Sequence, residues 1–164
     1  MKYKLFGTSG LRVTELALGT LTFGTELGWG EDKTESRRVF DAYVRAGGNF
    51  LDTANKYHGG ETEQILGNWF ENRPGRRDRT VLATKYTLSM DPRDPNAAGN
   101  QRKSLHHAIE GSLRRLGTDY IDLLWVHAWD DYTPHDETMR ALDDLVRAGK
   151  VLYIGASNYA AYRL

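Results

Sequence analysis

The chain has 164 residues, of which 40% are hydrophobic and 27% charged, and its formal net charge is zero. This composition is typical of a soluble globular domain, and because no basic stripe stands out we expect no nucleic-acid partner. The absence of cysteine excludes disulfides and thiolate metal sites. Residues 1–7 lack the apolar stretch of a signal peptide and no segment is long enough to span a bilayer. We therefore expect a cytoplasmic protein without a membrane partner.

Short apolar runs predict the strands in chain order. Residues 5–13 predict a hairpin that turns at Ser9 and Gly10. The later runs are apolar along their length, which is typical of parallel strands covered by helices on both faces. These predicted strands are residues 16–20, 50–54, 81–85, 123–127 and 153–157.

Helical periodicity fills the segments between these runs. Apolar residues recur three and four positions apart in residues 34–46, 61–71, 104–116 and 137–148. Gly47, Gly117 and Gly149 follow three of these segments, as glycines that end helices do. The last residues, up to Leu164, read as the beginning of a fifth helix.

This alternation predicts βαβ units and an α/β fold. One interpretation is an incomplete (β/α)8 TIM-type barrel with its first five strands and four or five helices, since a closed barrel needs roughly 250 residues. The other is a five-stranded doubly wound sheet of flavodoxin type. The barrel is favoured, because the first strand–helix loop is long and aromatic and the sequence contains neither G-x-G-x-x-G nor a P-loop.

Four titratable residues lie where predicted strands end or just beyond. They are Asp52, Tyr57, Lys85 and His127. A charged residue at the exit of a buried strand is costly unless it is paired. Because parallel strands end at one edge of a barrel, the spacing predicts that these side chains share one polar pocket.

Together these groups suit the reduction of a carbonyl. A phenol titrates near pH ~10, and an adjacent ammonium makes it a better acid. Asp52 would hold Lys85 near Tyr57, and His127 would polarise the carbonyl. Each residue alone is more easily explained by capping, packing or surface exposure, so the hypothesis rests on their joint placement. The adjacent His106 and His107 have no metal-ligand spacing around them, and we expect no metal site.

The sequence resembles the aldo-keto reductase family, particularly its bacterial branch related to the potassium-channel β-subunits. The similar stretches cover nearly the whole chain in the family's order. They are residues 7–13 (GTSGLRV), 18–20 (LGT), 50–54 (FLDTA) with Tyr57, 82–85 (LATK), 113–122 (LRRLGTDYID), His127 and 154–158 (IGASN).

The resemblance implies a role for each matching residue. Tyr57 would donate the proton, Lys85 would tune it, Asp52 would brace Lys85, and His127 would orient the substrate. The cofactor would be NADP(H), held at its nicotinamide end by residues that include Asp52. The others are Gly19, Thr20, Ser157 and Asn158. Loop residues Trp29, His58 and Trp129 are candidates for the substrate pocket or for packing.

The family pattern also implies parts that this sequence lacks. Residues 1–164 would form a single barrel domain truncated at its C-terminal side, without the loops that clamp the cofactor's phosphates. Open barrel edges would favour a homo-oligomer or a complementing chain. The implied function is NADP(H)-dependent reduction of a small aldehyde or ketone. A redox-sensing cofactor-binding module and an inactive truncated remnant are the alternatives.

Overall fold

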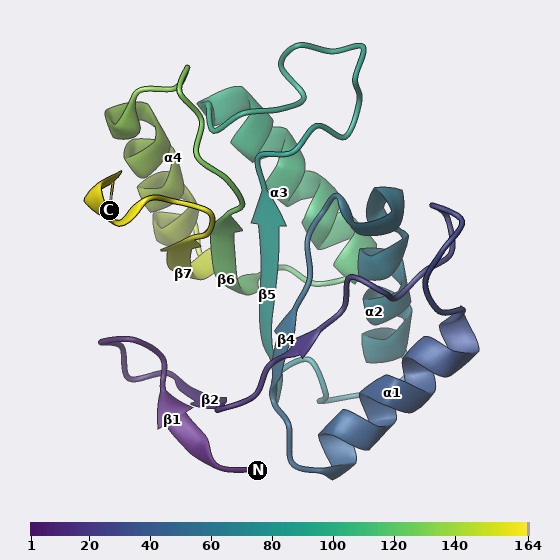
Figure 1. Cartoon of the computed structure of the whole chain (residues 1–164). Helices are drawn as coiled ribbons and strands as arrows, with labels where there is room; N and C mark the ends of the chain where they lie inside the picture. The colour runs from purple at the N-terminus through teal and green to yellow at the C-terminus, as the bar shows by residue number, and fades with distance from the viewer. Residues whose placement is uncertain (164) are drawn as a thin grey trace.

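A parallel sheet forms the centre of the computed structural model, which describes residues 1–163 (Figure 1). Its neighbouring strands are, in order, β3 (Leu18–Gly19), β4 (Phe50–Asp52), β5 (Val81–Tyr86), β6 (Ile121–Val126) and β7 (Val151–Ala156). All four pairings are parallel, so the α/β class is confirmed. The sequential order is that of a barrel. It excludes the flavodoxin order, in which the second strand lies outside the first.

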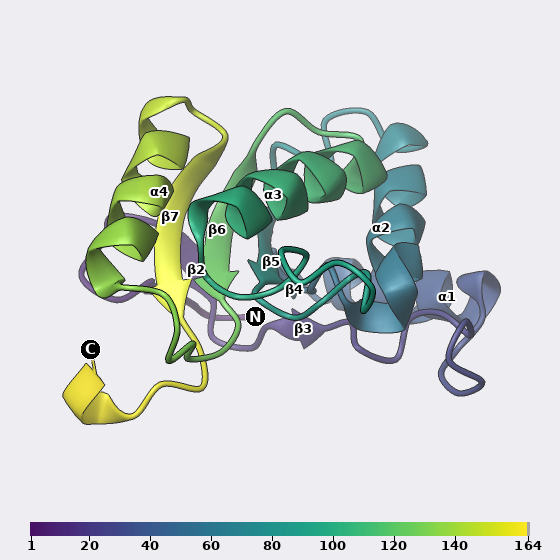
Figure 2. The ribbon, with the colours of Figure 1, turned by 90° about the horizontal axis from the view of Figure 1, so that it is seen from above.

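Helices cover the outer side of this curved sheet. They are α1 (Lys33–Arg45), α2 (Glu61–Glu71), α3 (Arg102–Leu116) and α4 (His135–Arg147). Figure 2 shows them as an arc around the strands. Each begins and ends within two residues of its predicted bounds, because the periodicity that identifies a helix fixes its ends less well than its existence.

The core lies between the helices and one face of the sheet. Leu82 and Leu124 on the strands pack in the same buried cluster as Leu66 of α2 and Ile109 of α3. Since side chains alternate along a strand, the intervening residues point to the opposite, concave face. Lys85 on β5 is one of them. This second face is also largely buried, and its polar groups gather toward the carboxyl ends of the strands.

The predicted hairpin lies at the amino ends of the strands. It consists of β1 (Tyr3–Leu5) and β2 (Arg12–Thr14), which pair antiparallel. The backbone N–H of Thr14 donates to Asn49 Oδ1 just before β4, at 2.8 Å. Phe6, in the turn segment, packs edge-on against Phe50 with 5.9 Å between ring centroids. The hairpin thus covers the bottom of the strands, opposite the edge where the titratable residues gather (Figure 1).

Several strand bounds and the end of the chain differ from the predictions. The strand predicted at 16–20 is reduced to Leu18–Gly19, and the strand predicted at 50–54 ends at Asp52. The strands predicted at 123–127 and 153–157 each begin two residues and end one residue earlier, as β6 and β7. The loop after β4 contains a short 3-10 helix, η1 (Tyr57–Gly60). In place of a fifth helix, Ala161–Arg163 form one 3-10 turn, η2. Leu164, which the same prediction includes, lies outside the described residues.

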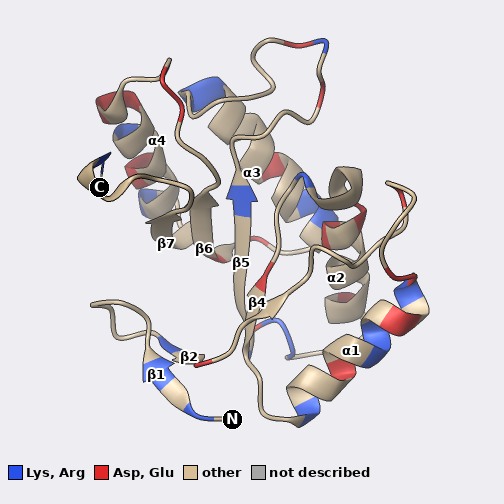
Figure 3. Ribbon diagram, in the orientation of Figure 1, with Lys and Arg blue, Asp and Glu red and all other residues tan. Residues whose placement is uncertain are grey.

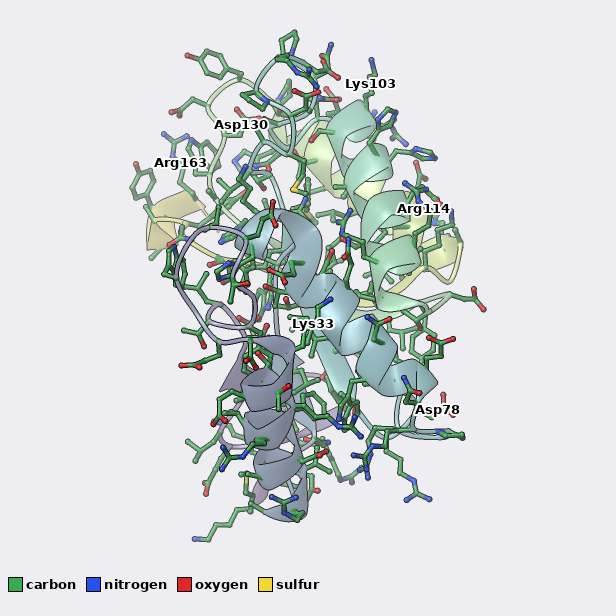
Figure 4. All side chains as sticks on the ribbon, turned by 90° about the vertical axis from the view of Figure 1, so that its right-hand side faces the viewer. Lys33, Asp78, Lys103, Arg114, Asp130 and Arg163 are labelled. Carbon is green, nitrogen blue, oxygen red and sulfur yellow. The ribbon has the colours of Figure 1, made fainter. Side chains whose placement is uncertain are left out.

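Charged residues are spread over the outer surface. Lys and Arg alternate with Asp and Glu along α1 and α4 in Figure 3. Figure 4 shows the helical side, where the labelled Lys33, Lys103 and Arg114 lie at the surface. Within residues 1–163, none of the helices has the length and apolar character needed to cross a membrane.

Candidate active site

Lys85 is at the centre of the polar groups on the concave face. Its side chain is 8% exposed, and its ammonium uses all three of its donors. Nζ lies 2.5 Å from Asp52 Oδ2, 2.8 Å from the carbonyl oxygen of Thr53 and 3.3 Å from the hydroxyl oxygen of Tyr57. The lysine therefore joins the end of β4 to the helical turn that follows it.

Tyr57 and His127 complete the group. Tyr57 begins η1, and His127 directly follows β6. Their rings meet edge to face with centroids 6.1 Å apart. The backbone N–H of His127 donates to the carbonyl oxygen of Tyr86 at 3.1 Å, which continues the ladder between β5 and β6 past the last residue of β6. The structure thus brings together all four residues that the sequence placed at strand ends.

The environment of His127 favours the neutral imidazole. Burial lowers its pKa below the ordinary value of about 6.5, and the Lys85 charge lowers it further, while Asp52 partly opposes this shift. Nδ1 is buried and has no hydrogen-bond partner within residues 1–163. A neutral imidazole carries one N–H, and with that hydrogen on Nε2 it can donate to a carbonyl oxygen.

A cavity of about 390 Å³ opens beside this cluster on the concave face. It is lined by Ala17, Gly19, Phe50, Asp52, Lys85, Trp125, Ala156 and Ser157. At Gly19 an added Cβ would meet no atom within 4 Å, so internal packing does not require glycine there. The missing side chain leaves the β3 backbone open to a ligand in the cavity.

Ser157 and Asn158 lie beside the cavity where β7 ends. Ser157 lines it directly, and Asn158 is exposed with a positive φ of 57°. The side-chain amide of Asn158 donates to the carbonyl oxygen of His127 at 2.6 Å and to Ser157 Oγ at 3.1 Å. Asn158 therefore ties the end of β7 to the end of β6 at the His127 backbone.

Thr20 does not present a polar side chain to the cavity, unlike the expectation from the sequence. It is fully buried, and both its backbone N–H and its hydroxyl donate to the carbonyl oxygen of Asp52, each at 3.0 Å. Thr20 makes these hydrogen bonds because it directly follows β3 and extends the pairing of that strand with β4. Its contribution is to hold the strand that carries Asp52.

His58, a candidate for the substrate pocket or for packing, has the contacts of a packing residue. It is 1% exposed, and both ring nitrogens are used: Nε2 lies 3.1 Å from the carbonyl oxygen of Leu21, and Nδ1 accepts the N–H of Leu27 at 3.4 Å. Glu61 holds the same loop by accepting the backbone N–H groups of Thr25 and Glu26. These hydrogen bonds lower the Glu61 pKa. His58 thus supports the β3–α1 loop.

The two loop tryptophans contact residues outside the titratable cluster. Trp29 is 46% exposed and packs at a tilt against His58, with ring centroids 4.6 Å apart and an angle of 55° between the ring planes. The Trp129 indole N–H donates to Asp131 at 2.5 Å, and its ring packs edge-on against Tyr159. Both side chains are engaged in packing, and no contact given by the structure connects either of them to Tyr57 or Lys85.

Trp125 is the site residue that sequence reasoning missed. Its indole Nε1–H donates to Asp52 Oδ1 at 3.1 Å. It lies within an apolar strand, where the sequence pattern predicts that a tryptophan belongs to the hydrophobic core. The available signal was its spacing, two residues before His127, which puts both on the same face of β6.

No metal site accompanies this cluster in residues 1–163, where no group of three or more His, Cys, Asp or Glu side chains could hold an ion. The cluster consists of a phenol hydroxyl beside an ammonium, with an imidazole against the phenol ring. Comparisons with known proteins identify the family. The model of the aldo/keto reductase family matches residues 15–164. The chain belongs to this family.

Similar aldo/keto reductase relatives come from fungi. Norsolorinic acid reductase A of Aspergillus parasiticus is 46% identical over 94% of this chain and 42% of its own length. Aldo-keto reductase ausK of Emericella nidulans is 40% identical over 98% of this chain and 43% of its own. Aryl-alcohol dehydrogenase [NADP(+)] of Phanerodontia chrysosporium is 41% identical, with 93% and 43% covered. The chain spans less than half the length of these relatives.

Proposed function

We propose that this chain carries the centre of an NADP(H)-dependent reductase that converts an aldehyde or ketone to an alcohol. One observation carries the proposal: the Lys85 ammonium contacts both the Asp52 carboxylate and the Tyr57 hydroxyl. This contact places a potential proton donor beside the charge that stabilises its conjugate base. Relatives named as reductases and as an NADP(+)-linked dehydrogenase support the same reaction class.

The chain's residues divide the proton chemistry among them. When bound, the nicotinamide cofactor supplies the hydride that attacks the carbonyl carbon. Tyr57 gives its phenolic proton to the carbonyl oxygen, so the product is an alcohol, and the phenolate then regains a proton from water. Lys85 stabilises the phenolate and Asp52 holds Lys85 in place. His127 donates a hydrogen bond to the carbonyl oxygen and orients the substrate.

The residues present fit the nicotinamide end of the cofactor. Gly19 leaves room above the β3 backbone, and Ser157 and Asn158 offer polar groups at the end of β7. Lys85 is the sole cation among the side chains that line the cavity, and it is already paired with Asp52. We infer that this cavity does not hold the adenosine 2′-phosphate, and we expect the chain by itself to bind NADPH weakly.

Steady-state consumption of NADPH with a panel of aliphatic and aromatic aldehydes tests the proposal. Y57F should abolish turnover and leave NADPH affinity nearly unchanged, because it removes only the proton donor. Y132F is the matched control, since Tyr132 is 96% exposed and belongs to no part of the site. Turnover by Y57F at the parent rate would overturn the role of Tyr57, and no turnover by the parent chain would overturn the proposed function.

The regulatory alternative has less support. A redox-sensing module related to the potassium-channel β-subunits would bind cofactor without appreciable turnover. The relatives reported above are fungal proteins named for enzymatic activities, and none is a channel subunit. Cofactor binding without turnover of any aldehyde in the panel would favour this alternative, and absence of both would favour the inactive remnant.

We also propose that the chain self-associates or pairs with a complementing chain. Within residues 1–163 the strands β3 and β7 each have one hydrogen-bonded neighbour, so both are edges of the sheet. Leu152 and Ile154 on β7 and Met139 on α4 are exposed beside one of these edges. Unpaired edges next to apolar surface favour association. Light scattering that reports a monomer at all concentrations would contradict self-association and leave only the complementing chain.

A further inference from the structure

We propose that Trp125 is the positioning residue that fixes the Asp52 carboxylate and, through it, the lysine beside Tyr57. Asp52 uses its two oxygens for two different donors. Oδ2 accepts a hydrogen bond from the Lys85 ammonium at 2.5 Å, and Oδ1 accepts one from the Trp125 indole N–H at 3.1 Å. The contact itself is independent of the proposed function, while its consequence for turnover rests on that function.

The register of three strands brings these side chains together. Lys85 on β5 pairs with Trp125 on β6, so the two stand side by side. Asp52 on β4 pairs with Ala83, one pleat before Lys85. The side chains of Lys85 and Trp125 therefore both point toward the amino ends of their strands to reach the same carboxylate. The indole reaches Asp52 from two strands away, so it connects β4 to β6 across the concave face.

Two other elements pack against the indole ring. Gly155 on β7 pairs with Trp125, and a Cβ at that glycine would lie 2.4 Å from the ring atom Cζ3. No real side chain tolerates that distance, so the ring occupies the space that glycine leaves. Phe6 from the hairpin turn also packs edge-on against the indole ring, with centroids 5.9 Å apart. The direction of the indole N–H is thus set before any ligand binds.

A fixed indole N–H restricts how the carboxylate can turn. The Asp52 side chain is 28% exposed, so water can reach it and compete for either oxygen. With Oδ1 bound to Trp125, Oδ2 is the oxygen that remains for Lys85. The ammonium then has its remaining N–H groups on the Thr53 carbonyl oxygen and the Tyr57 hydroxyl. A rotated carboxylate would pull Nζ away from the geometry that puts it 3.3 Å from Tyr57.

The hydrogen bond can be tested by its spectroscopic signature. The chain has four tryptophans, whose indole N–H groups each give one ¹H–¹⁵N signal, and W125F identifies the signal of Trp125. D52N should shift this signal strongly, because it replaces a charged acceptor by a neutral one. D41N is the matched control, since Asp41 accepts the Trp69 indole N–H at 3.3 Å, and it should shift only the Trp69 signal. A Trp125 signal that D52N leaves in place would overturn the proposal.

The positioning role is tested by removing the N–H and keeping the ring. β-(3-Benzothienyl)alanine at position 125 has the shape of tryptophan with sulfur in place of N–H. We expect kcat to fall about tenfold with KM unchanged, since a hydrogen bond to a charged group is lost. In a D52N background the same replacement should have no further effect on kcat. An unchanged kcat would overturn the positioning role. If the parent chain shows no turnover, the proposed function fails, and the D52N signal still decides whether the contact exists.

Discussion

The pair of Lys85 and Asp52 makes a quantitative prediction about stability. In D52N the buried ammonium of Lys85 would keep only neutral partners, the Thr53 carbonyl oxygen and the Tyr57 hydroxyl. Removing one partner of a buried ion pair costs about 3–5 kcal/mol. Because the Asp52 side chain is 28% exposed, solvent lessens this cost, and we expect D52N to lower the free energy of unfolding by about 1–3 kcal/mol.

Urea unfolding followed by far-UV circular dichroism measures this change. With a slope of about 2 kcal/mol per molar urea, the midpoint of D52N should fall by about 0.5–1.5 M. The double variant D52N/K85M removes both charges and should recover most of the loss. D136N is the matched control, because Asp136 and Arg140 form an exposed pair whose loss should leave the midpoint unchanged. A D52N midpoint equal to that of D136N would refute the view that Asp52 compensates a buried charge.

Three further variants test other parts of the structure. Burial lowers the His127 pKa, so the unfolded state binds more protons below about pH 6.5. The stability of the parent should therefore fall more steeply than that of H127Q between pH 7 and 5 in urea titrations. R115M leaves the fully buried Glu63 without its ion-pair partner and should lower Tm by roughly 10 °C in thermal melts. G155A places a methyl against Trp125 and should lower the urea midpoint, whereas an unchanged midpoint would contradict the close packing there.

The sequence predicted most of the fold and the members of the cluster. Apolar runs and helical periodicity predicted five parallel strands and four helices, and the structure confirms both. Asp52, Lys85 and His127 could be placed together because each ends or follows a strand, and parallel strands end at one edge of the sheet. Their functional roles remain predictions.

The loop residues could not be placed in the same way. Thr20 and His58 are polar residues that lie close in sequence to predicted site residues. Thr20 was a candidate for cofactor binding, and His58 was a candidate for the substrate pocket or for packing. Their polar atoms are instead used by backbone groups of Asp52 and of the loop after β3. Such contacts depend on the path of an irregular loop, and no periodicity in the sequence encodes that path.

Trp125 shows why the sequence of a buried parallel strand does not reveal which residues face the site. Leu124, Trp125 and Val126 form one apolar run, and a strand buried on both sides carries no alternation that tells core from site. A titratable residue on the same strand supplies the missing information. His127 lies in the cluster, so the residue two positions earlier points to the same face, and that residue is Trp125. Counting back two residues on β5 in the same way leads from Lys85 to Ala83, which pairs with Asp52 on β4. Because the alanine side chain is small, it leaves room for Lys85 and Trp125 to reach the Asp52 carboxylate.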